Sequence, residues 1–260
     1  MTITSSHNPK IKLIRALAGR AKERRENGAF LAEGVRLVEE AFSAGWNFKF
    51  VFYTDDMSQR GLDLVQALTA KGVDVEPVVE NVLQSVTETE TPQGILAVLA
   101  LDPPDSLQLP ANPDFILIPD QIRDPGNLGT LLRTAAAAGV QAVLIPPETT
   151  DPFAPKVVRA GMGAHFRLPI LSKTWNQLRE QLDGMSVYLS DAEGEKSCWE
   201  ADFTRPTALV IGGEADGASA QARSLATEMI CIPMPGKMES LNAGAAGAVL
   251  MYEVVRQRSR

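Results

Sequence analysis

Short apolar runs alternate with helical segments through the second half of the chain, and this alternation constrains the fold more than any other feature. We expect strands over 115–118, 142–145, 186–189, 208–211 and 229–232, and helices over 127–138, 175–182 and 242–256. Uninterrupted apolar strands are buried on both faces, so the pattern predicts an α/β fold with a mostly parallel sheet covered by helices. Such sheets bind ligands at the carboxyl ends of their strands, which makes the loops after the strands the candidate functional segments.

A proline-rich segment divides the chain. Residues 102–113 read DPPDSLQLPANP and contain four prolines, which are incompatible with a helix interior or a central strand. The part before it predicts a smaller α/β module, with a basic helix from Pro9 to about Asn27. Further helices are expected over 34–44 and 61–70, and strands over 48–53, 73–79 and 95–101. We therefore expect two domains, 1–104 and 105–260.

Composition excludes several protein classes. The 260 residues are 45% hydrophobic and 22% charged, which is typical of a globular protein. Cys198 and Cys231 are the only cysteines, and there are two histidines, so a disulfide framework is excluded and a zinc site is disfavoured. The longest apolar run, Ala243–Tyr252, is shorter than the roughly 20 residues of a spanning helix, and the N-terminus lacks an apolar signal region. A cytoplasmic protein is expected.

The charge is unevenly distributed. A net charge of −7 argues by itself against a nucleic-acid partner. Residues 10–25, however, contain seven basic residues and one acidic residue. This stretch is either a solvated helix face or an arm that contacts phosphates, and the sequence leaves both readings open.

The first candidate loop leads from residue 120 into the helix expected over 127–138. Leu128, Leu131, Leu132 and Ala135 share one helical face, so Arg133 is predicted to point away from it. Asn127 is either a helix cap or a functional amide, since asparagine commonly begins helices. Arg133 is either a solvated surface residue or a functional cation.

Two further loops follow the last two apolar strands. In the first of them, Gly212, Gly213 and Gly217 surround Glu214; this is either a site of close backbone approach to a ligand or an ordinary acidic turn. In the second, Ser240 or Asn242 is placed to cap the last helix. The small residues over 243–248 then predict close packing of that helix against another element. By contrast, Gly161-Met162-Gly163 lacks the context of a dinucleotide fingerprint, which argues against a nicotinamide enzyme.

The three loops in this order resemble the motifs of the SpoU (TrmH-type) RNA 2′-O-ribose methyltransferases of the SPOUT superfamily. The residues that carry the resemblance are Asp124–Gly129 with Arg133, then Gly212, Glu214 and Gly217, then Ile232, Pro233, Met234 and Gly236 with Ser240–Asn242. Phe30–Gly34 and Thr91–Ala97 are similar, more weakly, to the L30e-like substrate-binding domain of many members. One departure is Gly244, where many members have serine.

The resemblance implies a fold, a cofactor and an assembly. It implies a parallel sheet with a deep trefoil knot, an L30e-like first domain, and a homodimer formed near the final helix and the first motif. S-adenosylmethionine would bind without a metal. The implied cofactor-binding residues are Gly212, Gly213, Glu214, Gly217, Ile232, Met234, Gly236 and Leu241.

It also implies a reaction, methylation of a ribose 2′-hydroxyl. The implied catalytic residues are Arg133, Asn127, Glu214, Ser240 and Asn242. Because a guanidinium stays protonated, Arg133 is expected to clamp a phosphate and stabilise the developing alkoxide, and not to act as the general base. Ribosomal RNA is the favoured substrate; transfer RNA, or a non-enzymatic RNA-binding protein that keeps the fold, are the alternatives.

Overall fold

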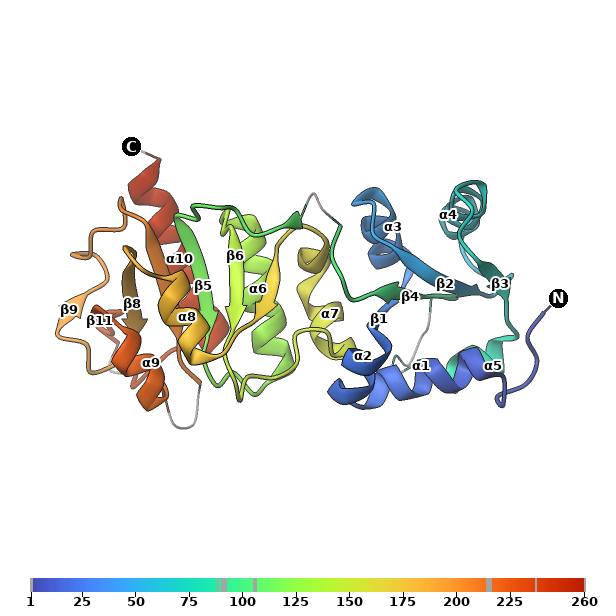
Figure 1. Cartoon of the computed structure of the whole chain (residues 1–260), viewed down its shortest axis with the longest axis horizontal. Helices are drawn as coiled ribbons and strands as arrows, with labels where there is room; N and C mark the ends of the chain where they lie inside the picture. The colour runs from blue at the N-terminus through green and yellow to red at the C-terminus, as the bar shows by residue number, and fades with distance from the viewer. Residues whose placement is uncertain are drawn as a thin grey trace. The chain divides into compact units, whose positions relative to one another are not determined.

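The chain forms two compact units, described here from a computed structural model (Figure 1). The structure describes residues 2–87, 89, 93–104, 107–213, 217–236 and 238–259. The first unit contains Met1–Leu107 together with Phe153–Phe166, and the second contains Gln108–Pro152 and Arg167–Arg260. The predicted division at 104/105 stays a prediction, and a stretch from the middle of the chain packs with the first unit.

The first unit is a mixed sheet between two helical layers. Its elements are α1 (Pro9–Gly19), α2 (Ala21–Asn27), β1 (Ala29–Glu33), α3 (Val35–Ser43), β2 (Phe48–Tyr53), α4 (Gln59–Ala70), β3 (Val75–Pro77), α5 (Glu80–Gln84), β4 (Ile95–Ala100), α7 (Pro155–Gly161) and the 3₁₀ turn η2 (Ala164–Phe166). The strand order is β1-β4-β2-β3, with β4 antiparallel to both neighbours. Side chains alternate between the faces, so that Leu31 packs with α1 and α5 and Phe30 packs with α3, α4 and α7.

The second unit is a seven-stranded sheet in which every pairing is parallel, as the apolar runs predict. Its elements are β5 (Phe115–Pro119), α6 (Pro125–Ala137), β6 (Ala142–Ile145), β7 (Ile170–Ser172), α8 (Trp175–Gln181), β8 (Ser186–Ser190), β9 (Lys196–Ser197), β10 (Thr207–Ile211), α9 (Ala220–Leu225), β11 (Glu228–Cys231) and α10 (Ala243–Arg258). The order is β7-β6-β5-β10-β8-β11-β9. Helices α8 and α9 cover one face, and α6 and α10 lie on the other (Figure 1).

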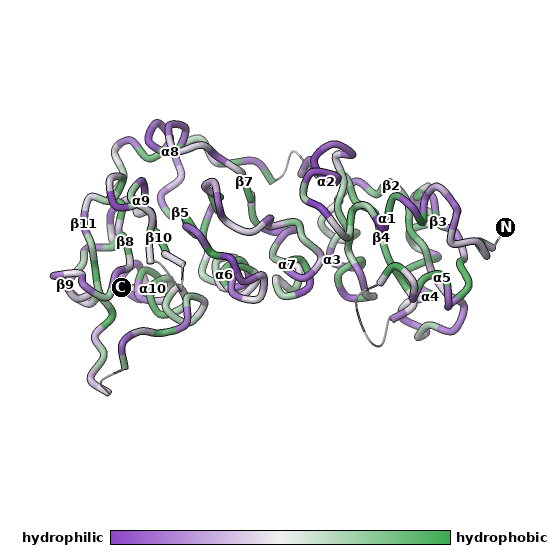
Figure 2. Tube along the Cα trace, turned by 90° about the horizontal axis from the view of Figure 1, so that it is seen from below, coloured by the Kyte–Doolittle hydropathy of each residue, from purple (hydrophilic) through white to green (hydrophobic). Residues whose placement is uncertain are grey.

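The expected basic helix is wrong in one respect, because it is two helices. Gly19 ends α1, and Arg20 has extended backbone angles before α2 begins. Glycine weakens a helix interior, which accounts for the break at this point. After the break the chain turns back, and the guanidinium of Arg24 donates to the carbonyl oxygen of Leu17 at 2.5 Å. Helix α2 is hydrophilic over nearly its whole length (Figure 2).

The strands β1, β7 and β9 and the helices α5, α7 and α9 were not expected. Of these, β7, β9, α5 and α9 are too short to show a clear period, whereas β1 and α7 are as long as β5 and α8, which were expected. Gly161 ends α7 and Met162 caps it in the left-handed conformation, so the Gly161–Gly163 run is a helix C-terminus and not a dinucleotide loop. In the described part of the chain, no helix combines the length and apolar character needed to cross a membrane. The trefoil knot stays a prediction.

Candidate functional site

A cavity of about 650 Å³ opens in the second unit at the carboxyl ends of β8, β10 and β11. This is the edge at which parallel sheets bind ligands. Its walls come from the loops that follow these three strands and from the start of α10. Of the predicted cofactor-binding residues, Gly212, Gly213, Gly217, Ile232, Met234 and Leu241 line it, and the predicted catalytic residue Ser240 lines it as well. The cavity volume is typical of a small-molecule site.

The glycines of the second loop are required by contacts within the protein. A Cβ on Gly213 would lie 2.5 Å from the carbonyl oxygen of Gln121, and one on Gly212 would lie 2.8 Å from the amide nitrogen of Ala218. Gly213 and Gly217 form an isolated bridge that closes the loop, and Gly217 has a φ of +67°. Close approach of backbone to backbone therefore shapes this wall. Glu214, which the motif places between them, lies outside the described residues.

The third loop contributes apolar side chains and one hydroxyl. Ile232 and Met234 follow β11, and Ser240 and Leu241 precede α10. Leu241 is 39% exposed, so its side chain is accessible to a molecule in the cavity. Gly236 does not line the cavity, and a Cβ at this position would meet no atom within 4 Å.

The first and third loops meet through two asparagines. The Nδ2 of Asn242 donates to the Oδ1 of Asn127 at 2.9 Å, although the residues are 115 positions apart. Asn242 caps α10 by accepting from the amide of Ala245. The reading of Asn127 as a cap is wrong, because Asp124 caps α6 by accepting from the Asn127 amide at 2.8 Å. The side chain of Asn127 is not used as a cap, and it accepts from Asn242 instead.

Arg133 lies on the exposed side of α6, as its helical position predicts, while Leu128 and Leu132 on the same helix are buried. Its guanidinium forms no hydrogen bond or ion pair with the described residues. A cation in this state keeps its full capacity to bind an anion from solution.

The small residues of α10 let it pack closely against α6, as expected. A Cβ on Gly247 would overlap the Cδ2 of Leu131, and one on Gly244 would lie 3.0 Å from the Cγ2 of Thr130. The departure at Gly244 thus has a local reason, since a larger residue would press on Thr130. Both helices begin at this contact, with Asn127 and Asn242 in their first turns or caps.

Sequence reasoning missed a buried carboxylate, Asp120, directly after β5. Its side chain is fully buried; Oδ2 accepts from the amide of Ser219 at 2.7 Å, and Oδ1 has no hydrogen-bond partner among the described residues. Burial raises the pKa of the Asp120 carboxyl. The signal was its position at the end of a buried strand, but its partner Ser219 is 99 residues away.

A second missed pair lies in the cavity wall. Asp191, which follows β8, forms an ion pair with Arg223 of α9 at 2.7 Å, and both residues line the cavity. The rule that ligands bind after parallel strands points to Asp191 as well. Over the ranges that the structure describes, no group of three or more histidine, cysteine, aspartate or glutamate side chains is placed to hold a metal ion.

Comparison with known proteins decides the family. A family model described as the SpoU rRNA Methylase family matches residues 114–252, and one described as the MRM3-like substrate binding domain matches residues 8–97. The chain belongs to the SpoU rRNA Methylase family. The resemblance stated from the motifs is confirmed, and so is the α/β class with a parallel sheet.

Relatives extend over nearly the whole chain. The 23S rRNA (guanosine(2553)-2′-O)-methyltransferase RlmP of Bacillus subtilis is 33% identical over 97% of this chain and 98% of its own length. The crystal structure of an rRNA methyltransferase from Sinorhizobium meliloti is 31% identical with a TM-score of 0.86, covering 98% of this chain and 97% of that one. The SpoU methyltransferase AviRb from Streptomyces viridochromogenes, in complex with AdoMet, is 28% identical with a TM-score of 0.86, covering 97% and 99%.

The buried Asp120 gives a prediction for stability. Because its pKa is raised, the folded state binds the proton more tightly than the unfolded state, and stability falls as pH rises from the ordinary aspartate pKa through the raised value. Asp120→Asn keeps an acceptor for Ser219 and removes the buried charge. The variant should therefore gain stability over the native chain as pH rises through this window. Urea unfolding at a series of pH values measures the difference; a gap that is independent of pH would contradict it.

Proposed function

We propose that this chain transfers a methyl group from S-adenosylmethionine to a ribose 2′-hydroxyl of ribosomal RNA. The observation that carries the proposal is the cavity formed by the motif loops, together with the asparagine contact that brings the first motif to the third. The B. subtilis relative is named as a 23S rRNA 2′-O-methyltransferase, and AviRb was crystallised with AdoMet. These names favour ribosomal RNA over transfer RNA as the substrate.

The cavity residues suit the proposed cofactor. The group supplies a methyl already activated on a sulfonium, so the protein needs to hold and orient it and not to activate it. Ile232, Met234 and Leu241 offer apolar surface, and the glycine loop offers backbone polar groups at the end of β10. We assign Gly212, Gly213, Gly217, Ile232, Met234 and Leu241 to cofactor binding. Gly236 and Glu214 are assigned from the motif alone.

The acceptor hydroxyl must be aligned with the methyl group. As the oxygen–methyl bond forms and the sulfur–methyl bond breaks, the hydroxyl proton passes to solvent water. Holding two reactants in line lowers the barrier by removing orientational freedom. We assign this task to Asn127 and Asn242, which fix each other's amides, and to the hydroxyl of Ser240. Arg133 carries an exposed guanidinium on the same helix as Asn127; it clamps the adjacent phosphate and stabilises the alkoxide as it forms. Glu214 would orient Arg133.

The two predicted domains have different roles in the proposed reaction. We propose that residues 1–104 bind the RNA and that 105–260 perform the transfer, which the MRM3-like match over 8–97 supports. The free thiols of Cys198 and Cys231 fit a reducing compartment, and we propose a cytoplasmic location.

Three single variants test the site. Arg133→Ala should reduce methyl transfer by at least about 100-fold, as for removal of one oxyanion-stabilising donor, with little change in cofactor affinity. Gly213→Ala should weaken S-adenosylmethionine binding, because its Cβ would force the loop away from Gln121. Gly19→Ala is the matched control, since Gly19 belongs to the first unit and its Cβ would meet nothing within 4 Å.

The measurements are calorimetric titration with S-adenosylmethionine and transfer of labelled methyl groups to ribosomal RNA. Turnover by Arg133→Ala near the native level would remove that residue from the mechanism. Absence of cofactor binding by the native chain would leave the non-enzymatic RNA-binding alternative.

The basic stretch gives a prediction for RNA binding. Arg24 is buried, and its guanidinium donates to the carbonyl oxygen of Leu17. Lys10 forms ion pairs with Asp74 and Glu76. Neither Arg24 nor Lys10 is therefore free to contact RNA. Reversing the exposed Lys12, Arg15 and Arg20 to glutamate should weaken RNA binding. It should also flatten the log–log salt dependence by roughly 0.7–0.9 for each phosphate that the variant no longer neutralises.

The control for this experiment reverses three other exposed cations, Lys71, Lys156 and Arg179. It changes the net charge by the same amount. Equal reductions of RNA affinity in the two triple variants would show that total charge, and not the basic stretch, governs the binding.

We also propose a homodimer that uses α10. Tyr252 lies on this helix and is 51% exposed, as expected for an aromatic side chain that a partner covers. Light scattering should give twice the mass of one chain. The substitution Tyr252→Glu should lower the measured mass toward that of the monomer. A monomeric mass for the native chain would contradict the proposal.

A further inference from the structure

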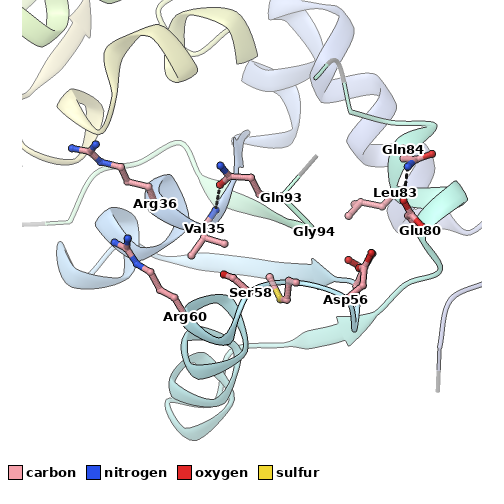
Figure 3. Close-up of a pocket in the computed structure, with 12 residues that line it drawn as sticks. Val35, Arg36, Asp56, Ser58, Arg60, Glu80, Leu83, Gln84, Gln93 and Gly94 are labelled. Carbon is pink, nitrogen blue, oxygen red and sulfur yellow. Dashed lines mark hydrogen bonds between the residues drawn. The ribbon is translucent and has the colours of Figure 1, made fainter. Parts of the chain in front are cut away.

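We propose that a cavity in the first unit holds one unpaired guanine nucleotide of the RNA, separate from the nucleotide that receives the methyl group. The inference rests on the proposed function only in taking RNA as the source of the nucleotide. The cavity has a volume of about 550 Å³ and lies between the start of α3, the loop from β2 to α4, and α5 (Figure 3). The cofactor cavity belongs to the second unit, so the two sites are distinct.

One side of the cavity suits a phosphate. Arg36 and Arg60 both line it, and Figure 3 shows their guanidinium groups on the same side. Arg60 donates its Nε and Nη2 to Glu39 on α3, which leaves its Nη1 as a donor, whereas Arg36 is exposed and has no partner among the described residues. An arginine donates two parallel hydrogen bonds to a phosphate. Ser58 lines the same cavity and caps α4 as an acceptor, which leaves its hydroxyl hydrogen available to donate.

The opposite side suits the hydrogen-bonding edge of a base. The carboxylates of Asp56 and Glu80 lie there, away from the two arginines (Figure 3). The side-chain Nε2 of Gln84 donates a hydrogen bond to the Oε1 of Glu80 at 2.7 Å. No ion pair joins these carboxylates to Arg36 or Arg60 in the described part of the chain, so the two signs of charge stay on separate sides of the cavity.

Carboxylates accept hydrogen bonds and do not donate them. The Watson–Crick edge of guanine carries two adjacent donors, N1–H and the N2 amino group, and fits a carboxylate. Uracil has one donor between two acceptors and fits poorly. Met57 also lines the cavity and is only partly buried, so it offers apolar surface for the face of a base. Because this edge must be free of a pairing partner, the nucleotide is unpaired, as is usual where proteins read RNA sequence.

Two contacts hold the start of α3 and the end of β2 close to the segment that precedes β4. The amide of Val35, at the start of α3, donates to the Oε1 of Gln93 at 3.0 Å. Gly94 has a φ of +75°, and a Cβ there would lie 2.6 Å from the Oγ1 of Thr54. A polarised cavity favours one orientation of its ligand, with the phosphate at the arginines and the base at the carboxylates.

The test is a titration of the isotope-labelled full chain with 5′-GMP, followed through the backbone amide signals and compared with AMP, CMP and UMP. GMP should give saturable shifts at residues 34–36, 56–60 and 93–94, with an affinity at least about tenfold above that for UMP, or roughly 1.4 kcal/mol. Arg36→Ala should weaken all four nucleotides, whereas Asp56→Ala with Glu80→Ala should remove the preference for GMP. Lys71→Ala, which removes an exposed cation of the same unit that does not line the cavity and lies outside the basic stretch, is the control.

Absence of saturable shifts at these residues, or equal affinities for the four nucleotides, would overturn the proposal. Loss of the GMP preference in Lys71→Ala would overturn it too. The same samples are titrated with S-adenosylmethionine. If that titration fails while the GMP response is as expected, the proposed methyl transfer is wrong and the nucleotide cavity stands.

Discussion

The parallel pairing of β5 with β10 sets the geometry on which the site depends. Pro119 is in register with Ile211, so both strands end at the same level and their loops begin side by side. In the loops that follow, the Oδ2 of Asp120 accepts a hydrogen bond from the backbone amide of Ser219. Gly213 packs against the backbone carbonyl of Gln121. Segments about a hundred residues apart thus form one wall. The sheet order reverses direction at this pair, which is the position where open parallel sheets bind ligands.

The packing of α6 against α10 completes the arrangement. The glycines of α10 let Leu131 and Thr130 approach its backbone, and this closeness allows Asn242 to reach Asn127. Small residues here serve a geometric purpose, because one added methyl at Gly247 would force Leu131 to move. The amide pair therefore depends on the close fit between the two helices as much as on the asparagines themselves.

Long apolar strands were predictable and the contacts between loops were not. The limits of β2 and β6 could be recognised in the sequence, because β2 is rich in aromatic residues and β6 is an aliphatic run that two prolines follow. The position of Asp120 after a buried strand was visible in the sequence, but its burial was not, because the amide that stabilises it belongs to Ser219. Arg24 was counted with the surface cations because many helices tolerate a single glycine, and the sequence alone did not show that the helix ends at Gly19. The motif residues gave the family, but their spacing could not show that Asn127 meets Asn242.

The stretch 153–166 belongs to the first unit although it lies between two strands of the second. Val158 and Phe166 from this stretch are buried in the same core as Phe30 and Trp46. The chain therefore passes between the units three times. A proteolytic cut in the proline-rich segment would not release the first unit, because α7 and η2 would remain on the other fragment and still complete its core. The two fragments would stay associated, because each would supply part of the core of the first unit.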